Sequence, residues 1–144
     1  MRRVGVRPLW LGHAGDARDL AGLLNLGIAA IVDLAWDEPP ATVTRDVVYC
    51  RFPLVDGSGN PPWLLRTAVE TVARLIRDGV STFVFCGAGL SRSPAIVAAS
   101  LALAENCPIG EGWNEVMPRG GDLAPGLWQD LVKLLGSLRP SAVS

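Results

Sequence analysis

Apolar residues form two kinds of pattern along the chain: short continuous runs, and longer segments in which they recur every three or four positions. The short runs are rich in β-branched and aromatic residues, which is typical of strands covered on both faces. We expect strands at 9–11, 28–34, 47–54 and 82–85. The first is the shortest, and we place it at an edge of the sheet.

The periodic segments predict helices, and their boundaries carry capping and stop signals. Asp16 stands as an N-cap with Asp19 three residues later, a weak form of the capping box, and Gly27 supplies a left-handed stop. Pro62 and Pro125 suit first helical positions. The expected helices span 16–26, 62–78, 93–104, 109–117 and 125–138.

Strands that alternate with helices imply an α/β protein of three layers, with a central, mostly parallel sheet of four to five strands and helices on both faces. A length of 144 residues is typical of one domain, so we expect residues 1–144 to form a single unit. In such sheets ligands bind beyond the carboxyl ends of the strands. The loops that follow strands are therefore the first place to look for chemistry.

One of these loops carries an unusual set of residues, C-G-A-G-L-S-R-S, from Cys86 to Ser93. Glycines in the loop let successive backbone N–H groups turn inward, and the following helix adds its positive N-terminal end. Ser93 suits the N-cap of that helix and Pro94 its first position. We predict an anion cradle with Cys86 at its floor, formed by Gly87, Ala88, Gly89, Leu90, Ser91 and Arg92.

This environment assigns a chemical role to each polar side chain. A helix N-terminus and a nearby arginine favour the thiolate of Cys86, which is the nucleophilic form. Arg92 is suited to grip two phosphate oxygens, and the Ser93 hydroxyl to hydrogen-bond the sulfur and ease its departure. The alternative for Cys86 is an inert buried cysteine at the end of a strand.

Composition narrows the setting and the partners. A hydrophobic fraction of 49% and a mean hydropathy of +0.31 favour a compact core, and a net charge of −1 gives no general attraction to nucleic acid or anionic membranes. With one histidine and three unpatterned cysteines, we expect no metal site and no cofactor. The N-terminus has no apolar run of secretory length, so we expect a cytoplasmic protein that does not bind membranes. We also expect a monomer.

The loop from Cys86 to Ser93 resembles the signature loop of cysteine-dependent protein tyrosine phosphatases, of the small dual-specificity type. The similarity extends to L-W-L-G-H-A-G-D-A-R-D-L, I-A-A-I-V-D-L and V-V-Y-C-R-F-P-L, and so spans nearly the whole chain. It implies a phosphatase-like fold and hydrolysis through a phosphocysteine intermediate. It also implies a general acid about thirty residues before the cysteine, on a loop after a strand.

Asp56 meets that description: it lies thirty residues before Cys86, in the turn-rich segment D-G-S-G-N. A carboxyl there is expected to protonate the leaving oxygen. The alternative is that Asp-Gly serves only as turn chemistry. Asp37 and Glu38, in another loop after a strand, are the next candidates for the acid.

The chain departs from the family at Phe85, where histidine usually precedes the cysteine and keeps its thiol acidic. His13 is expected to be a helix-entry or surface residue rather than a replacement. Cys50 is either a core residue or a redox partner of Cys86, and Trp36 and Trp63 flank the two strand-following loops.

The function that follows is hydrolysis of a phosphomonoester, with a phosphorylated tyrosine, serine or threonine side chain as the substrate class that the resemblance implies. The loop between Cys86 and Arg92 contains no lysine or arginine, which disfavours polyphosphorylated inositides. The alternative is a catalytically weak pseudophosphatase that recognises phosphorylated partners. A redox or arsenate-reducing enzyme needs a resolving cysteine, which neither the loop nor its helix contains.

Overall fold

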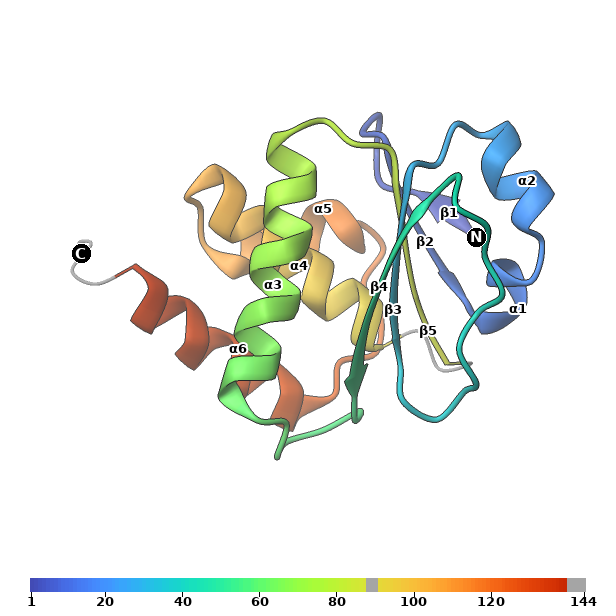
Figure 1. Ribbon diagram of the computed structural model, residues 1–144. Coiled ribbons are helices and arrows are strands. Elements are labelled where there is room, and N and C mark those ends of the chain that lie inside the picture. Colours follow the sequence, from blue (N-terminus) through green and yellow to red (C-terminus); the bar gives the residue numbers. More distant parts are fainter. Residues whose placement is uncertain (88–90, 140–144) are drawn as a thin grey trace.

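The computed structural model describes residues 1–87 and 91–139. They form a five-stranded sheet in the order β1-β2-β5-β3-β4, in which β1 is antiparallel to β2 and the other neighbours are parallel. The strands are β1 (Arg2–Arg3), β2 (Leu9–His13), β3 (Ala30–Ala35), β4 (Val48–Leu54) and β5 (Thr82–Cys86). The carboxyl ends of the four parallel strands therefore meet at one end of the sheet, at the bottom of Figure 1.

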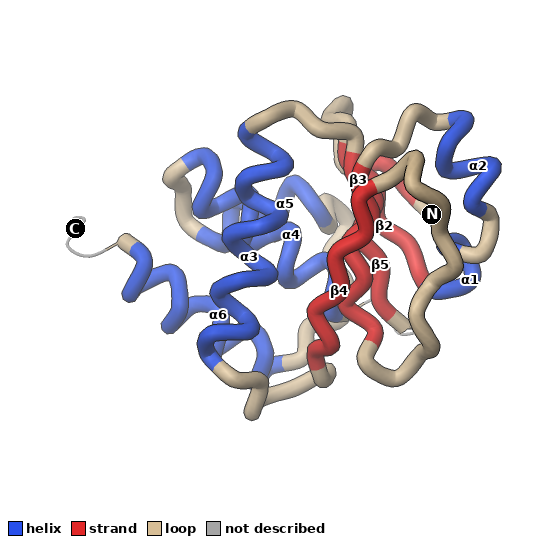
Figure 2. Tube along the Cα trace, in the orientation of Figure 1, coloured by secondary structure: helices blue, strands red, loops and turns tan. Residues whose placement is uncertain are grey.

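Helices cover both faces of this sheet (Figure 2). They are α1 (Ala14–Ala17), α2 (Leu20–Asn25), α3 (Pro62–Arg77), α4 (Arg92–Glu105), α5 (Ile109–Val116) and α6 (Pro125–Leu138). The first two lie on one face, and the other four lie on the opposite face. The predicted three-layer α/β architecture is confirmed, and β5, which ends in Cys86, is the central strand.

The prediction that the first apolar run lies at an edge is wrong. Arg2 and Arg3 pair with Trp10 and Leu11, so β1 is the edge strand and β2 lies inside the sheet. The strand β1 consists of two exposed arginines, which show no alternation of apolar and polar residues. The hydropathy pattern therefore could not predict this strand.

The prediction of one helix capped by Asp16 is also wrong, because two short helices occupy this segment. His13 is the N-cap of α1, with its side chain accepting from the N–H of Gly15, and Asp16 is the N3 residue that accepts from the N–H of His13. Asp19 caps the second helix instead and accepts from Gly22 at 3.0 Å. Gly27 does adopt the expected left-handed conformation, at φ +81°.

The core that fixes the site lies between the sheet and the larger helical layer. Every residue of β3 and β5 is buried, and α4 is buried from Arg92 to Ala102. A Cβ added to Gly112 of α5 would meet the carbonyl oxygen of Ala98 at 2.3 Å, so α5 packs directly on the α4 backbone. The helix that follows the Cys86 loop is thus held by packing along its length. Among the helices of the described residues, none is long and apolar enough to cross a bilayer.

Candidate active site

Cys86 lies at the end of the central strand, directly before the loop that leads into α4. Its side chain is fully buried, and its Sγ lies 3.2 Å from the Oγ of Ser93. The predicted contact between the sulfur and this hydroxyl is therefore present. Ser93 is not the N-cap, however: α4 begins at Arg92, with Ser91 at the N-cap position and without a side-chain capping bond. Ser93 is instead the second residue of α4, and its side chain is fully buried.

Arg92 is the first residue of α4 and is 5% exposed. Its Nη1 donates to the carbonyl oxygen of Leu54 and to Oδ1 of Asp37, each at 2.9 Å. Leu54 is the last residue of β4, and Asp37 lies two residues after the end of β3. The guanidinium is therefore held from two adjacent strands at the same rim of the sheet. The hydrogen bond from Arg92 holds the pKa of the Asp37 carboxyl below its ordinary value.

Asp56 reaches the same loop from the other side. The hydroxyl of Ser91 donates to Oδ2 of Asp56 at 2.5 Å, across 35 residues of sequence. Asn60 fixes the Asp56 loop by exchanging hydrogen bonds with the backbone of Val55, at 2.9 and 3.0 Å. Sequence reasoning placed Asp56 on this rim, but missed Asn60, whose only signal was a polar residue before two prolines.

The beginning of the predicted cradle is crowded by charged side chains. A Cβ added to Gly87 would lie 2.8 Å from Nη2 of Arg92 and 2.9 Å from Oδ2 of Asp37, so a larger residue here would displace one of these two side chains. Three of the predicted phosphate-binding residues lie outside the described residues: Ala88, Gly89 and Leu90.

The two other acid candidates have partners of their own. Asp37 is bound to Arg92, as described above. The carboxylate of Glu38 lies 3.5 Å from Nη2 of Arg18 instead. Among the three carboxylates, Asp56 is the one whose interaction with the loop goes through a neutral hydroxyl rather than a cation.

Phe85 belongs to the small core on the α1 and α2 side of the sheet, where it is 2% exposed and stacks on Phe83 with ring centroids 5.6 Å apart. His13 lies opposite Cys86 in the sheet register, but its side chain caps α1 and is half-exposed. The prediction of a helix-entry role for His13 is confirmed. The position before the cysteine is thus taken by an apolar core residue, Phe85.

Replacing Phe85 by histidine, the residue usual in the family, is expected to lower the free energy of unfolding. The ring loses its contacts with Phe83 and places two polar nitrogens in an apolar core, which costs about 2–4 kcal/mol. Urea unfolding of both proteins, followed by circular dichroism, measures the difference. A difference below about 1 kcal/mol, within the range of ordinary substitutions, would contradict the packing role.

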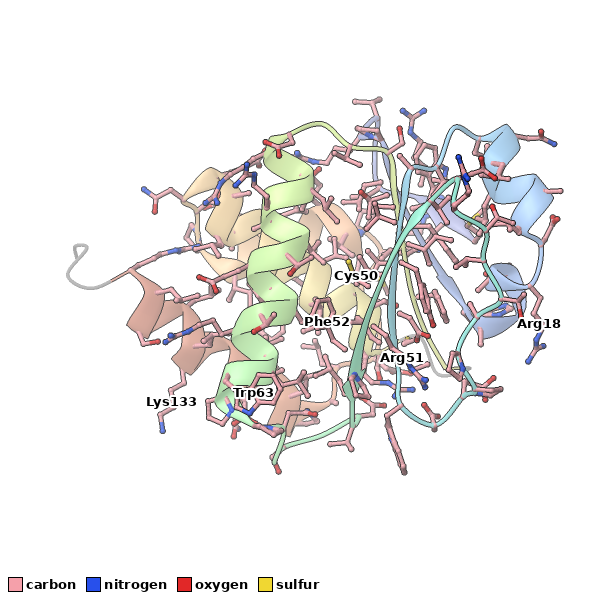
Figure 3. All side chains as sticks on the ribbon, viewed as in Figure 1. Arg18, Cys50, Arg51, Phe52, Trp63 and Lys133 are labelled. Atoms are coloured by element: carbon pink, nitrogen blue, oxygen red, sulfur yellow. The ribbon has the colours of Figure 1, made fainter. Side chains whose placement is uncertain are left out.

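Cys50 is too far from Cys86 to form a disulfide in this structure. Cys50 on β4 pairs with Val32 on β3, and Val32 pairs with Val84 on β5, the strand that carries Cys86. Two strand spacings, about 9.5 Å, therefore separate β4 from β5. Bridged cysteines have Cα atoms within about 7 Å. Figure 3 shows Cys50 directed towards the helical layer. The structure therefore disfavours the redox interpretation, while Cys50 itself is only partly buried.

Beside the Asp56 loop, a groove of about 590 Å³ lies between the start of α3 and α6. Trp63, which is 68% exposed at the start of α3, and Lys133 of α6 both line it (Figure 3). Trp36 is exposed on the other rim loop. Both tryptophans are exposed beside the two rim loops, but the groove that Trp63 lines does not include Cys86.

A buried cysteine between the central strand and a helix, with a buried arginine and a carboxylate converging on the same loop, defines an α/β protein with a candidate oxyanion site at the carboxyl end of its sheet. No protein-family model matches the chain. The mouse dual specificity protein phosphatase 13B is 36% identical over 110 residues, which are 70% of this chain and 55% of that protein. The human dual specificity protein phosphatase 15 is 31% identical over 115 residues, 78% of this chain and 37% of that protein.

A solved structure extends the comparison to the whole fold. The crystal structure of a mouse dual specificity phosphatase complexed with zinc tungstate has a TM-score of 0.82 and 25% identity, covering 97% of this chain and 89% of that one. The chain belongs to the dual-specificity phosphatases, in the cysteine-dependent protein tyrosine phosphatase family, and its fold is that of the small type.

Proposed function

We propose that this protein hydrolyses phosphomonoesters through a phosphocysteine intermediate on Cys86. One observation carries the proposal: at the carboxyl end of the sheet, the sulfur of Cys86 contacts the Ser93 hydroxyl within a loop that Arg92 and Asp56 also reach. The chain covers only part of the curated relatives, so its own activity rests on this geometry.

The first step uses three side chains. The thiolate of Cys86 attacks phosphorus, and the bond from phosphorus to the ester oxygen breaks. Arg92 holds two of the phosphate oxygens and stabilises the charge that grows on them in the transition state. Asp56 donates its proton to the leaving oxygen, which departs as a neutral alcohol or phenol.

The second step restores the enzyme. The Asp56 carboxylate takes a proton from water, whose oxygen attacks phosphorus, and the sulfur–phosphorus bond breaks. The Ser93 hydroxyl, 3.2 Å from the sulfur, donates a hydrogen bond to the departing thiolate. Inorganic phosphate leaves, and Cys86 and Asp56 are again ready for substrate.

The substrates that we propose are phosphorylated tyrosine, serine or threonine side chains of proteins, as the names of the relatives suggest. A catalytic thiol needs a reducing compartment, for which the cytoplasm is our proposal. Release of phosphate from matched phosphotyrosine and phosphoserine peptides tests the substrate class. No release from either peptide would contradict it.

The second candidate is a pseudophosphatase that binds phosphorylated partners without turnover. Phe85 favours it, because the histidine that accompanies efficient catalysis in the family is replaced by an apolar core residue. Tungstate binding without any hydrolysis of p-nitrophenyl phosphate would support this alternative.

Replacing Asp56 by asparagine is expected to lower kcat about 100-fold for a phosphoserine peptide, and only a few-fold for p-nitrophenyl phosphate. An alkoxide leaving group needs the proton, whereas p-nitrophenolate is stable without it. Asparagine keeps an oxygen for the Ser91 hydroxyl, so the loop contact remains. Steady-state kinetics on both substrates measures the contrast. Equal losses on both substrates would place the acid elsewhere.

A further inference from the structure

The loop after β3 makes a contact with the site that the proposed mechanism does not use. We propose that Asp37 is a positioning residue: it holds Nη1 of the Arg92 guanidinium so that the Nε–Nη2 edge faces the bound oxyanion. This inference deepens the proposed function and rests on the same site. It gives Asp37, which the sequence offered only as a next candidate for the acid after Asp56, a different role.

The hydrogen bonds of Arg92 divide its guanidinium into two parts. Nη1 is saturated by Asp37 and the carbonyl oxygen of Leu54, each at 2.9 Å. Nε is buried and has no hydrogen-bond partner among the described residues. A buried donor without a partner is costly, and phosphate recognition by arginine commonly uses two parallel N–H groups. The Nε–Nη2 edge is therefore the one left to grip an oxyanion.

This edge lies beside the first residue of the cradle. The position of a Cβ on Gly87 is 2.8 Å from Nη2 of Arg92, and Gly87 directly follows Cys86. Asp37 thus bonds Nη1, while Nη2 stays close to the loop that the phosphate is proposed to occupy. The same Cβ position lies 2.9 Å from Oδ2 of Asp37, so the carboxylate itself stands at the border of the cradle.

A partly buried network holds the loop that carries Asp37. Nη2 of Arg51 donates to the carbonyl oxygens of Ala35, at 2.9 Å, and of Glu38, which lie on either side of Asp37 in the sequence. Figure 3 shows Arg51 on β4, near the lower end of the sheet. Its Nε lies 3.5 Å from Oδ2 of Asp33, a fully buried carboxylate. The loop is thereby tied to both β3 and β4.

Tyr49 completes this network. Its hydroxyl donates to Asp33, and it accepts from the N–H of Ala41 at 3.0 Å. Burial and the hydrogen bond to Asp33 raise the pKa of Tyr49 to about 12, so the phenol stays protonated and keeps donating at neutral pH. Three side chains that never touch the phosphate site therefore fix the backbone on either side of Asp37.

A competing interpretation makes the opposite prediction. If Asp37 only neutralises Arg92, its carboxylate competes with phosphate, and removing its charge should tighten oxyanion binding. The geometry favours positioning, because Asp37 engages Nη1 and leaves the buried Nε unused. The Asp37 carboxylate is half-exposed and the Arg92 guanidinium is buried, so the ion pair fixes the orientation of the buried arginine.

Two variants test the proposal. Asp37→Asn removes the charge at the same size, and Asp46→Asn, in the same connection between β3 and β4, is the matched control, since Asp46 is exposed and bonds only Thr44 among the described residues. Isothermal titration with inorganic phosphate gives the oxyanion affinity without any turnover. We expect Asp37→Asn to raise the Kd about tenfold, because charge-assisted hydrogen bonds are roughly twice as strong as neutral ones. The Asp46 control should leave the Kd unchanged.

Alkylation of Cys86 gives a second readout that a loss of fold would not imitate. Iodoacetate carries a carboxylate that the guanidinium edge can attract, whereas iodoacetamide is neutral. The ratio of the two rates is expected to fall several-fold in Asp37→Asn, while the iodoacetamide rate stays within about twofold. Asp37→Glu, which keeps the charge but moves it by one methylene, should lie between the wild type and Asp37→Asn.

The outcomes separate this inference from the proposed function. An unchanged or tighter Kd for Asp37→Asn overturns the positioning role, even if the wild type hydrolyses phosphomonoesters. A tenfold weaker Kd in a protein that hydrolyses none supports positioning and contradicts the proposed function. A wild type without preference for iodoacetate that also fails to bind phosphate overturns both.

Discussion

Replacing Cys86 by serine is expected to lower kcat for p-nitrophenyl phosphate by at least about 10⁴-fold, comparable with the removal of a nucleophile from other covalent enzymes. A serine hydroxyl is protonated at neutral pH, and no described side chain beside it is placed as a general base. The substitution keeps the size and the contact with Ser93, so the fold and the oxyanion site should persist. Release of p-nitrophenolate, with phosphate affinity measured in parallel, checks both parts.

Cys107→Ser is the matched control for this experiment. Cys107 follows α4, is partly exposed and lies outside the site, so its replacement should leave kcat within about twofold. Trapping a phosphorylated intermediate in the wild type and in Cys107→Ser, but not in Cys86→Ser, would identify the nucleophile. Equal inactivity of all three proteins, with phosphate still bound, would leave the pseudophosphatase as the function.

Replacing Arg92 by lysine is expected to lower kcat/KM by about 10³-fold, although the positive charge remains. Lysine cannot present two parallel N–H groups to a phosphate, and it cannot keep the contacts to Leu54 and Asp37 at the same time. Because the guanidinium grips charge that grows in the transition state, the loss should appear in kcat as well as in KM. Initial rates over a range of substrate concentrations separate the two.

Arg74→Lys controls for the exchange itself. Arg74 is exposed on α3 and pairs with Asp78 four residues later, so lysine can replace it with little effect on kcat/KM. If Arg92→Lys also stayed within about threefold of the wild type, bidentate binding by Arg92 would be excluded, and the Asp37 proposal would lose its basis.

Much of the site could be predicted because its signals are local. The run from Thr82 to Cys86 is continuous and apolar, and the loop that follows carries glycines and then helical residues, so strand, loop and helix are each specified by neighbouring residues. The role of Asp56 came from the resemblance to the family. Its hydrogen bond to Ser91 places it at the loop, while its acid role remains a prediction.

The two N-cap predictions were wrong because a good capping residue can also take another position in or near the helix. Ser93 and Asp16 are both good N-caps in isolation, but α4 starts one residue before Ser93, and Asp16 serves as the N3 residue of α1. The residue type alone does not show whether a serine or aspartate caps a helix or faces inward. Packing of α4 against the sheet and α5, rather than helix propensity, decides which way the Ser93 hydroxyl points.

The sequence by itself determined the α/β class, the strand that ends in Cys86, and the glycine-rich loop that leads to Arg92, because these depend on residues close together in the chain. Only the tertiary structure decided that Arg92 meets Asp37, 55 residues away, and that Arg51 ties the Asp37 loop to the sheet. Strand order and register bring these residues to one rim, and such long-range pairing is not encoded in any local pattern. The same pairing places Asp37, one of the two next candidates for the acid after Asp56, against Arg92, and the positioning role proposed for it rests on that contact.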